Sequence, residues 1–257
     1  LPTPKHRSGT AHLPDVTTLD MSLEMPGAAS ASLSARLVEE LGENLRRGEQ
    51  SILLLNRRGY NTLVKCAVCS TVATCPNCSV ALTYHSANGR LICHYCGHIA
   101  QPQAACPVCG NRFLRFSGAG TQKVEEELHT LFPQARVLRM DLDTTMSRFS
   151  HERYFNDISA GKYDIVIGTQ MVAKGLDFPN VTLVGVLSAD AALYAQDYRS
   201  YERAFSLFTQ VVGRSGRAQK AGRAYIQTFT PENSVIALAA AQDYDSFYAE
   251  EIESRRI

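Results

Sequence analysis

The sequence lacks the features of a membrane protein or a disordered chain. Its 257 residues contain no apolar stretch near the roughly 18 residues that cross a bilayer, and no charged-then-apolar secretion signal opens it. Net charge is small, because 26 Lys and Arg residues are set against 25 Asp and Glu, and 45% of residues are hydrophobic. We therefore expect a globular protein of the reducing cytoplasm, with no membrane partner, built as one large domain or as one domain carrying a smaller module.

Two further absences single out one segment of the chain. Residues 51–120 contain no Asp or Glu but six Lys and Arg residues, and no cysteine lies outside residues 66–109. The eight cysteines form four CxxC pairs, which are Cys66/Cys69, Cys75/Cys78, Cys93/Cys96 and Cys106/Cys109. A large cysteine-free body needs no disulfide framework, whereas two CxxC turns together complete a tetrahedral four-thiolate site for Zn²⁺. The spacing predicts two zinc ions per chain.

The four CxxC pairs can be combined into two sites in three ways. The fourteen residues between Cys78 and Cys93 alternate in character and predict a hairpin, as in a zinc ribbon. This hairpin favours a nested arrangement, with one ion held by Cys75, Cys78, Cys93 and Cys96 and the other by Cys66, Cys69, Cys106 and Cys109. We expect His85, His94 and His98 to lie at the surface or beside a ligand without binding metal.

The rest of the chain alternates short apolar strands with amphipathic helices, which predicts an α/β fold with a doubly wound parallel sheet. The expected helices are 32–47, ended by Gly48, 121–131, capped by Thr121, 150–160, 200–212 and one from 232 onward. The expected strands are 51–56, 136–140, 164–168, 181–187 and 224–229. Residues 1–30 are expected to be a linker or an added edge segment, residues 31–64 and 115–235 the body, residues 65–114 the inserted zinc module and residues 236–257 a carboxyl-terminal helix.

Ligands of such sheets bind beyond the carboxyl ends of the strands, where we expect two polar segments to lie. In residues 168–179, the hydroxyl of Thr169 and neighbouring backbone amides could hold a phosphate, although an ordinary strand-to-helix connection is the better explanation of this segment taken alone. In residues 210–217, the spacing places Gln210, Arg214 and Arg217 on one helix face. The two glycines of that segment favour close approach to a polyphosphate over a merely solvated helix end.

Three stretches carry a resemblance to a known family. GTQMVAKGLDFP at 168–179 and QVVGRSGR at 210–217 resemble motifs V and VI of superfamily 2 helicases, and LLLNRRGY running into four CxxC pairs resembles the primosomal replication-restart helicases. The resemblance covers nearly the whole chain from about Leu33. It implies a RecA-like second motor lobe with a zinc-binding insertion, in an ATP-driven 3′-to-5′ DNA helicase that reloads the replisome at stalled forks. The implied partners are forked or single-stranded DNA, primosome proteins, single-strand-binding proteins and a first helicase lobe.

The resemblance also implies roles for residues facing the nucleotide. Arg217 matches the arginine finger of the family, which stabilises charge on the γ-phosphoryl group during transfer. Arg214 and Gln210 match its neighbours in the nucleotide cleft. Asp177 matches the motif V carboxylate that communicates with the nucleotide, and Gly175 lies two residues before it.

A second set of matches faces nucleic acid. Thr169 and Gln170 match positions near the nucleic-acid backbone, and Asn56 and Arg57 match motif IV.

The sequence contains only part of an ATPase site. A phosphate-binding loop of the GxxxxGK[ST] type is missing, since the one Gly-Lys pair, Gly161-Lys162, is followed by Tyr163, and no Asp-Glu pair is present to bind Mg²⁺. We therefore expect ATP and Mg²⁺ to act only in an enzyme that has both lobes, and this chain alone to be inactive. An alternative remains open, in which the zinc insertion docks DNA or a partner and the RecA-like part is a catalytically idle scaffold.

Overall fold

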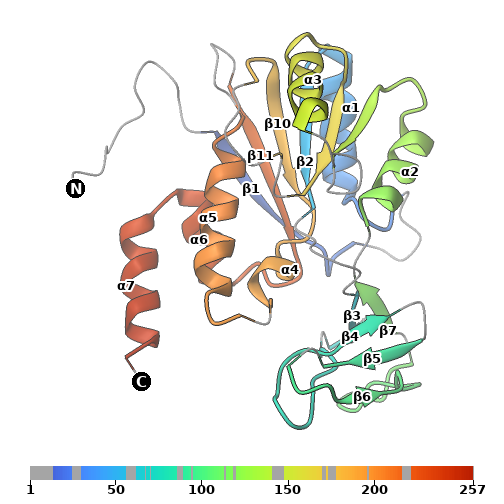
Figure 1. Cartoon of the computed structure of the whole chain (residues 1–257), viewed down its shortest axis with the longest axis vertical. Helices are drawn as coiled ribbons and strands as arrows, with labels where there is room; N and C mark the ends of the chain where they lie inside the picture. Colours follow the sequence, from blue (N-terminus) through green and yellow to red (C-terminus); the bar gives the residue numbers. More distant parts are fainter. Residues whose placement is uncertain are drawn as a thin grey trace.

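The structure is a computed structural model that describes the chain in separate stretches. They are residues 14–24, 30–55, 62–66, 68–69, 71–85, 89–93, 95–112, 114–117, 120–140, 148–169, 172, 178–195, 197–215 and 221–256. Two sheets organise these residues, and Figure 1 shows them one above the other.

The larger sheet has six strands that all run parallel. Its order is β1 (Asp15–Asp20), β11 (Arg223–Thr228), β10 (Val181–Val186), β2 (Gln50–Leu54), β9 (Ile165–Gly168) and β8 (Val137–Met140). Every residue of β2, β9 and β10 is buried. Burial on both faces explains why these strands are continuous apolar runs instead of alternating patterns. The predicted α/β fold with a parallel sheet is confirmed.

Helices cover both faces of this sheet (Figure 1). The helices α1 (Ala35–Arg46) and α2 (Thr121–Leu131) pack on one face around Leu37, Leu41 and Leu128. The other face carries α3 (Arg148–Ser159), α5 (Ser200–Val212) and α6 (Ser234–Ala241), whose apolar residues join a larger core cluster around Phe208. A short helix α4 (Asp190–Leu193) follows β10, and α7 (Tyr244–Ser254) lies outside α5 and α6. None of the helices in the described part of the chain is long and apolar enough to cross a membrane.

The ends of α1 follow the sequence signals. Ser34 caps the amino end, because its hydroxyl oxygen accepts a hydrogen bond from the Leu37 amide at 3.2 Å. Gly48 adopts a φ of +65° directly after the helix, so glycine ends it as predicted.

Two predicted helix boundaries are wrong. The sequence predicts Thr121 as the cap of α2, but it is the first helical residue, and Gly120 occupies the capping position without a side-chain hydrogen bond. The single helix expected from residue 232 is two helices, because Gln242 takes the left-handed conformation with a φ of +55°. Asp243 then caps α7 by accepting a hydrogen bond from the Ser246 amide at 3.0 Å. Left-handed glutamine is uncommon, and the sequence holds no glycine to mark this break.

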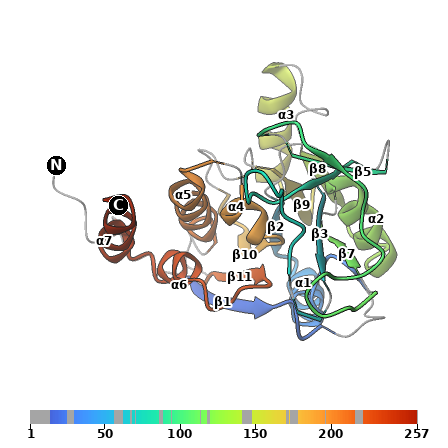
Figure 2. The same ribbon diagram turned by 90° about the horizontal axis from the view of Figure 1, so that it is seen from below.

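The smaller sheet is antiparallel, and all four CxxC pairs lie at the ends of its strands or in the segments that connect them. Its order is β6 (Ile99–Ala100), β5 (Arg90–Ile92), β4 (Thr83–His85), β3 (Thr62–Cys66) and β7 (Leu114–Ser117). The hairpin predicted between Cys78 and Cys93 is present as β4 and β5. The sheet runs from residue 62 to residue 117, a few residues wider at each end than the span of 65–114 expected from the cysteines. It lies beyond the carboxyl ends of the parallel strands (Figures 1 and 2).

Gly168 lies where β9 reaches the carboxyl edge of the parallel sheet. A Cβ atom there would lie 2.4 Å from Val172 Cγ1 and 2.9 Å from the Met140 carbonyl oxygen. By contrast, a Cβ atom at Gly42, inside α1, would meet only the Phe132 ring at 3.5 Å, an ordinary contact. Because the backbone of Met140 lies so close to Gly168, only glycine fits easily at the first position of the segment 168–179.

We expect Gly168→Ala to lower the free energy of unfolding by about 1–3 kcal/mol, because the Met140 backbone cannot move away cheaply. Gly42→Ala is the matched control and should raise stability by about 0.5–1 kcal/mol through helix propensity. Urea denaturation of the two variants would measure both changes. Equal effects of the two substitutions would contradict the close approach at Gly168.

Candidate functional site

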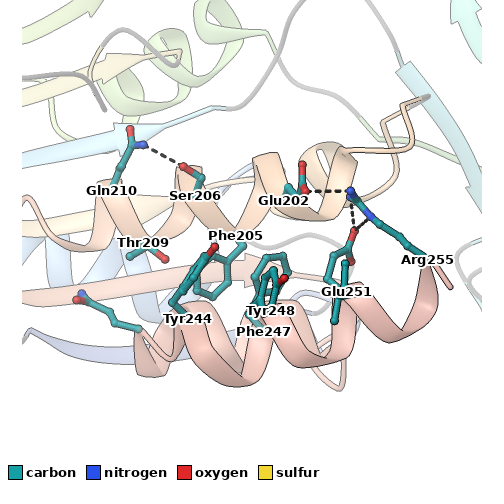
Figure 3. Close-up of a pocket in the computed structure, with 12 residues that line it drawn as sticks. Glu202, Phe205, Ser206, Thr209, Gln210, Tyr244, Phe247, Tyr248, Glu251 and Arg255 are labelled. Carbon is teal, nitrogen blue, oxygen red and sulfur yellow. Dashed lines mark hydrogen bonds and ion pairs between the residues drawn. The ribbon is translucent and has the colours of Figure 1, made fainter. Parts of the chain in front are cut away.

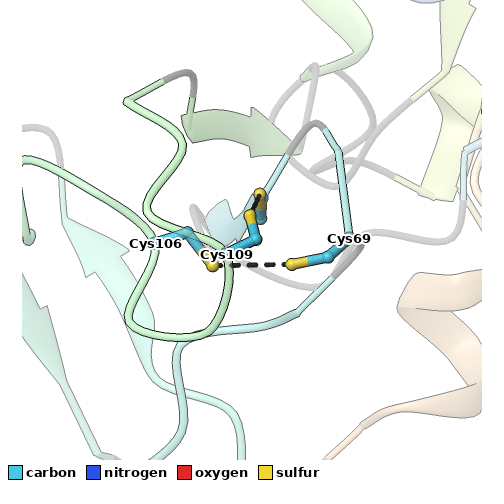
Figure 4. A group of neighbouring side chains, drawn as sticks. Cys69, Cys106 and Cys109 are labelled. Atoms are coloured by element: carbon cyan, nitrogen blue, oxygen red, sulfur yellow. Dashed lines mark hydrogen bonds between the residues drawn. The ribbon is translucent and has the colours of Figure 1, made fainter.

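The eight cysteines gather into two groups of four. One group contains Cys66, Cys69, Cys106 and Cys109, and the other contains Cys75, Cys78, Cys93 and Cys96, with the sulfurs of each group within 4.8 Å of one another. This is the grouping that the nested arrangement predicts. In the first group, shown in Figure 4, the sulfurs of Cys66 and Cys109 lie 3.5 Å apart, as do those of Cys69 and Cys106. Four thiolates about 2.3 Å from a tetrahedral zinc ion lie roughly 3.8 Å apart, so both groups fit that ion.

All four CxxC turns share one backbone hydrogen bond. The amide of the first cysteine in each turn donates to the carbonyl five residues later, over 2.7–2.8 Å. The pairs are Cys66 to Thr71, Cys75 to Val80, Cys93 to His98 and Cys106 to Asn111. Because the same bond recurs at each turn, the four turns are copies of one local structure, and each presents two sulfurs on one side.

The residue after the second cysteine of a turn has a special conformation. Gly97 and Gly110 have φ angles of +76° and +72°, and Ser79, at the equivalent position of the second turn, has a φ of +57°. Glycine adopts this region without cost, whereas serine pays for its Cβ atom. The second turn is therefore the strained one among these three.

Hydrogen bonds make the sulfurs of a group unequal before metal binds. The pKa of Cys69 is lowered to about 6, chiefly because the Thr71 hydroxyl lies 3.0 Å from its sulfur. The pKa of Cys78 is raised to about 12 by hydrogen bonding to Cys96, whose own pKa is lowered to about 7 by the His98 amide. One thiolate thus forms first and holds its neighbour protonated. A divalent cation removes that conflict, since it favours all four thiolates together.

The module around these groups has a very small apolar core. Within the described residues its buried members are Val64, Leu82, Leu91, Cys75 and Cys93, and a few partly buried side chains, Ala73, Cys78, Val80, Tyr84 and Ala100, pack against them. Such a core supplies little stability, and small domains of this kind usually depend on a metal or a disulfide. His98 belongs to neither group of four. The side chains of His85 and His94 lie outside the described residues.

Thr169 lies at the carboxyl edge of the parallel sheet, next to the end of β2. The Leu55 amide donates to the Gly168 carbonyl at 2.9 Å, so the chain leaves β2 and β9 at neighbouring points. Thr169 is half-buried, and its carbonyl accepts from the Val172 amide at 3.1 Å. The other residues expected to contact nucleic acid, Gln170, Asn56 and Arg57, lie outside the described residues.

Residues 210–215 lie at the opposite edge, which corrects the expectation that both polar segments gather at the carboxyl ends. Because β10 and β11 are adjacent and parallel, α5 must run back along the sheet, from α4 at the carboxyl edge to the amino end of β11 (Figure 1). The expected single helix face is also wrong, since α5 ends at Val212. Arg214 lies in the turn after it, where its amide donates to the Val211 carbonyl at 2.9 Å.

Gln210 is exposed on the last turn of α5 and donates to the Ser206 hydroxyl at 3.0 Å (Figure 3). Arg217, Asp177 and Gly175 lie outside the described residues. Phe178 follows Asp177 in the chain and is described; it is buried, and its carbonyl accepts from the Val181 amide at the amino end of β10.

Sequence reasoning missed two contributors to the cysteine groups. Thr71 comes two residues after Cys69, and Ser79 directly after Cys78. The glycines that follow Cys96 and Cys109 could have indicated a positive φ at Ser79, because these residues occupy equivalent positions in their turns. No comparable signal marked the Thr71 hydroxyl.

Comparisons with known proteins match these two parts of the structure. Residues 75–100 match the family described as the PriA DNA helicase Cys-rich region domain, and residues 110–219 match the helicase conserved C-terminal domain. The replication restart protein PriA of Bacillus subtilis is 48% identical over 98% of this chain and 31% of its own length. That of Chlamydia trachomatis is 44% identical over 98% of this chain and 34% of its own length. Among solved structures, RecG bound to a three-way DNA junction aligns over 95% of this chain and 22% of its own, with 10% identity and a TM-score of 0.47.

The parallel sheet and the cysteine-rich ribbon together define a helicase C-terminal lobe that carries a zinc-ribbon insertion. The chain belongs to the PriA family of replication restart helicases. It spans about a third of the length of the curated relatives it matches.

We expect Ser79→Gly to strengthen zinc retention by roughly fivefold, because it removes about 1 kcal/mol of left-handed strain. Competition with a chromogenic chelator, followed at equilibrium, would measure this change. Ser79→Ala is the control, since alanine keeps the Cβ atom and loses only the hydroxyl. An equal gain in Ser79→Ala would assign the effect to the hydroxyl and contradict the strain.

Proposed function

We propose that this chain is the second motor lobe of an ATP-dependent 3′-to-5′ DNA helicase that acts in replication restart and primosome assembly at stalled forks. The observation that carries the proposal is the separation of the two motif sets at opposite edges of one sheet. Thr169 lies at the carboxyl edge, and Gln210 and Arg214 lie at the amino edge. A motor lobe must bind DNA and nucleotide at the same time, so the residues that contact DNA and those that contact the nucleotide must lie in separate places.

The amino edge is the proposed nucleotide side. Gln210, Arg214 and Arg217 belong to motif VI, and Arg217 is the proposed arginine finger. Its planar guanidinium would spread charge over two phosphate oxygens in the transition state, which a single ammonium cannot do. Asp177 and Gly175 precede the amino end of β10 in the chain and would join this side. The first lobe must supply the phosphate-binding loop and the Mg²⁺ carboxylates.

The carboxyl edge is the proposed DNA side. Thr169 and Gln170 would donate hydrogen bonds to backbone phosphates, and Asn56 and Arg57 would do so from the neighbouring end of β2. Contacts of this kind hold a strand without reading its sequence, which suits an enzyme that moves along DNA. The antiparallel module lies beyond the same edge, where forked DNA would meet it.

Each four-cysteine group would hold one Zn²⁺, with Cys66, Cys69, Cys106 and Cys109 at one ion and Cys75, Cys78, Cys93 and Cys96 at the other. The ions would hold the module in place of a larger core and leave no open coordination position for chemistry. Cysteines kept out of disulfides in this way fit a reducing cytoplasm. By resemblance, primosome proteins and single-strand-binding proteins are the proposed partners.

A second candidate is a binding module on a catalytically idle scaffold. It is favoured by apolar side chains exposed at the tips of three CxxC turns, Val68, Tyr95 and Val108, which are 66%, 78% and 71% exposed.

Combining this chain with the first lobe distinguishes the candidates. Recovery of DNA-stimulated ATP hydrolysis supports the motor lobe, whereas DNA binding without hydrolysis supports the scaffold.

We expect two zinc ions per chain by inductively coupled plasma mass spectrometry. The double variant Cys69→Ser with Cys109→Ser should lose one ion, because both residues belong to one group. The double variant Cys69→Ser with Cys96→Ser should lose both ions. Loss of both ions from the first double variant would refute the nested pairing while leaving the zinc count intact.

In a protein with both lobes, Arg217→Ala should reduce ATP turnover on the order of a thousandfold and leave the KM for ATP nearly unchanged. Arg217→Lys should not restore turnover, because lysine lacks the planar fork. Steady-state kinetics would measure both. A raised KM with unchanged kcat would mean ground-state binding and would rule out the arginine finger.

A further inference from the structure

Helix α7 is joined to α5 by an aromatic contact between the first turn of α7 and the middle of α5. The rings of Phe247 and Phe205 stack with centroids 4.1 Å apart and planes 8° from parallel (Figure 3). Both side chains are buried, and Tyr244 lies against the same Phe205 ring at 6.2 Å. This contact fixes the distance between the two helices.

A second contact joins the carboxyl end of α7 to the beginning of α5. Arg255 Nη1 lies 3.0 Å from Glu202 Oε1 on α5, and Nη2 lies 2.6 Å from Glu251 Oε1 on α7. The same guanidinium lies over the Tyr198 ring at 5.7 Å and donates to the Tyr198 carbonyl at 3.5 Å. Arg255 therefore holds three elements together, which are α7, α5 and the connection between α4 and α5.

The packing between α5 and α7 is not continuous. A cavity of about 420 Å³ lies between the two helices, bounded by these aromatic residues and by Thr209 and Gln210 on α5. The aromatic stack and the Arg255 contacts are therefore direct contacts between α7 and α5 beside this pocket. The contact at Arg255 is the polar one among them.

Helix α5 connects the two edges of the parallel sheet. It contains thirteen residues and is therefore about 20 Å long. Glu202 lies in its first turn, beside the carboxyl edge, and Gln210 in its last turn, beside the amino edge. A helix of this length moves as a rigid rod, so a shift at its first turn reaches Gln210 and the turn of Arg214.

We propose that Arg255 is a positioning residue that couples the carboxyl edge to the amino edge through α5. The inference rests on the proposed function, in which these edges hold DNA and nucleotide. Arg255 clamps the α4–α5 connection and α5 to one support, α7, so that a strand binding beyond the carboxyl ends displaces α5 as a unit. Without the clamp, the connection moves alone and the amino edge does not respond. Basal hydrolysis needs no such transmission.

The test is the stimulation of ATP hydrolysis by single-stranded DNA in a protein that carries both motor lobes. Arg255→Ala should lower the ratio of stimulated to basal kcat by roughly tenfold, within the range of coupling energies known for such networks. Basal kcat and the KM for ATP should stay within about twofold of the parent protein. The matched control is Arg256→Ala, since the Arg256 side chain is 71% exposed and pairs with the exposed Glu253 at 3.3 Å, on its own helix end. This control should leave the stimulation unchanged.

Two further measurements separate coupling from folding. Thermal unfolding should show that Arg255→Ala keeps its cooperative transition, and Tyr198→Leu should lower the stimulation while leaving the ion pairs of Arg255 in place. The double variant should be no worse than Arg255→Ala alone, because both residues act through one clamp. Normal stimulation in both single variants would overturn the proposal. A parent protein that hydrolyses ATP without any response to DNA would instead overturn the proposed function, and the proposal with it.

Discussion

Parallel pairing of the six strands is the constraint on which the rest of the structure depends. Parallel neighbours cannot be joined by a tight turn, so each connection must leave one edge of the sheet and return to the other. Helices α1, α2, α3 and α5 lie in such connections, α6 follows the last strand, and the apolar sides of these helices contribute to the two core clusters. The same constraint makes the edges chemically distinct, because one edge collects the segments that leave the strands and the other collects the segments that leave the helices. The separation of these two edges is a direct product of strand direction.

The insertion differs from the parallel sheet in how little apolar core it has. The buried part of its described core is three aliphatic side chains and two cysteines, which is too little to order its strands by hydrophobic burial. The proposed zinc ions would take over this role, and the recurring backbone hydrogen bond at Cys66, Cys75, Cys93 and Cys106 gives all four turns the same local structure. One chain thus combines a part ordered by removal of apolar surface from water with a part whose proposed source of order is metal coordination by cysteine.

Local signals in the sequence were sufficient for the sheet, the helices of the body and the cysteine groups. Buried strands such as β2 are apolar throughout, and CxxC spacing identifies a metal-binding turn without further context. Signals failed where tertiary structure decides. Gln242 takes a glycine-like conformation, and Thr121 fits both a cap and a first turn. The edge on which Arg214 lies follows from the direction of α5, which no pattern within residues 210–217 contains. The clamp of Arg255 joins residues 57 positions apart and has no local signature.

The way the insertion is attached has a consequence for its independence. Its first and last strands, β3 and β7, pair with each other, with Leu63 opposite Ser117 and Cys66 opposite Leu114. The two points at which the chain leaves and rejoins the parallel body are therefore neighbours. The insertion of more than fifty residues therefore starts and ends at points no further apart than two paired strands. The conformational entropy lost when these residues become ordered is compensated by contacts within the insertion, not by contacts with the parallel body. The lobe can thus consist of two cooperative units that melt separately although they share one uninterrupted backbone.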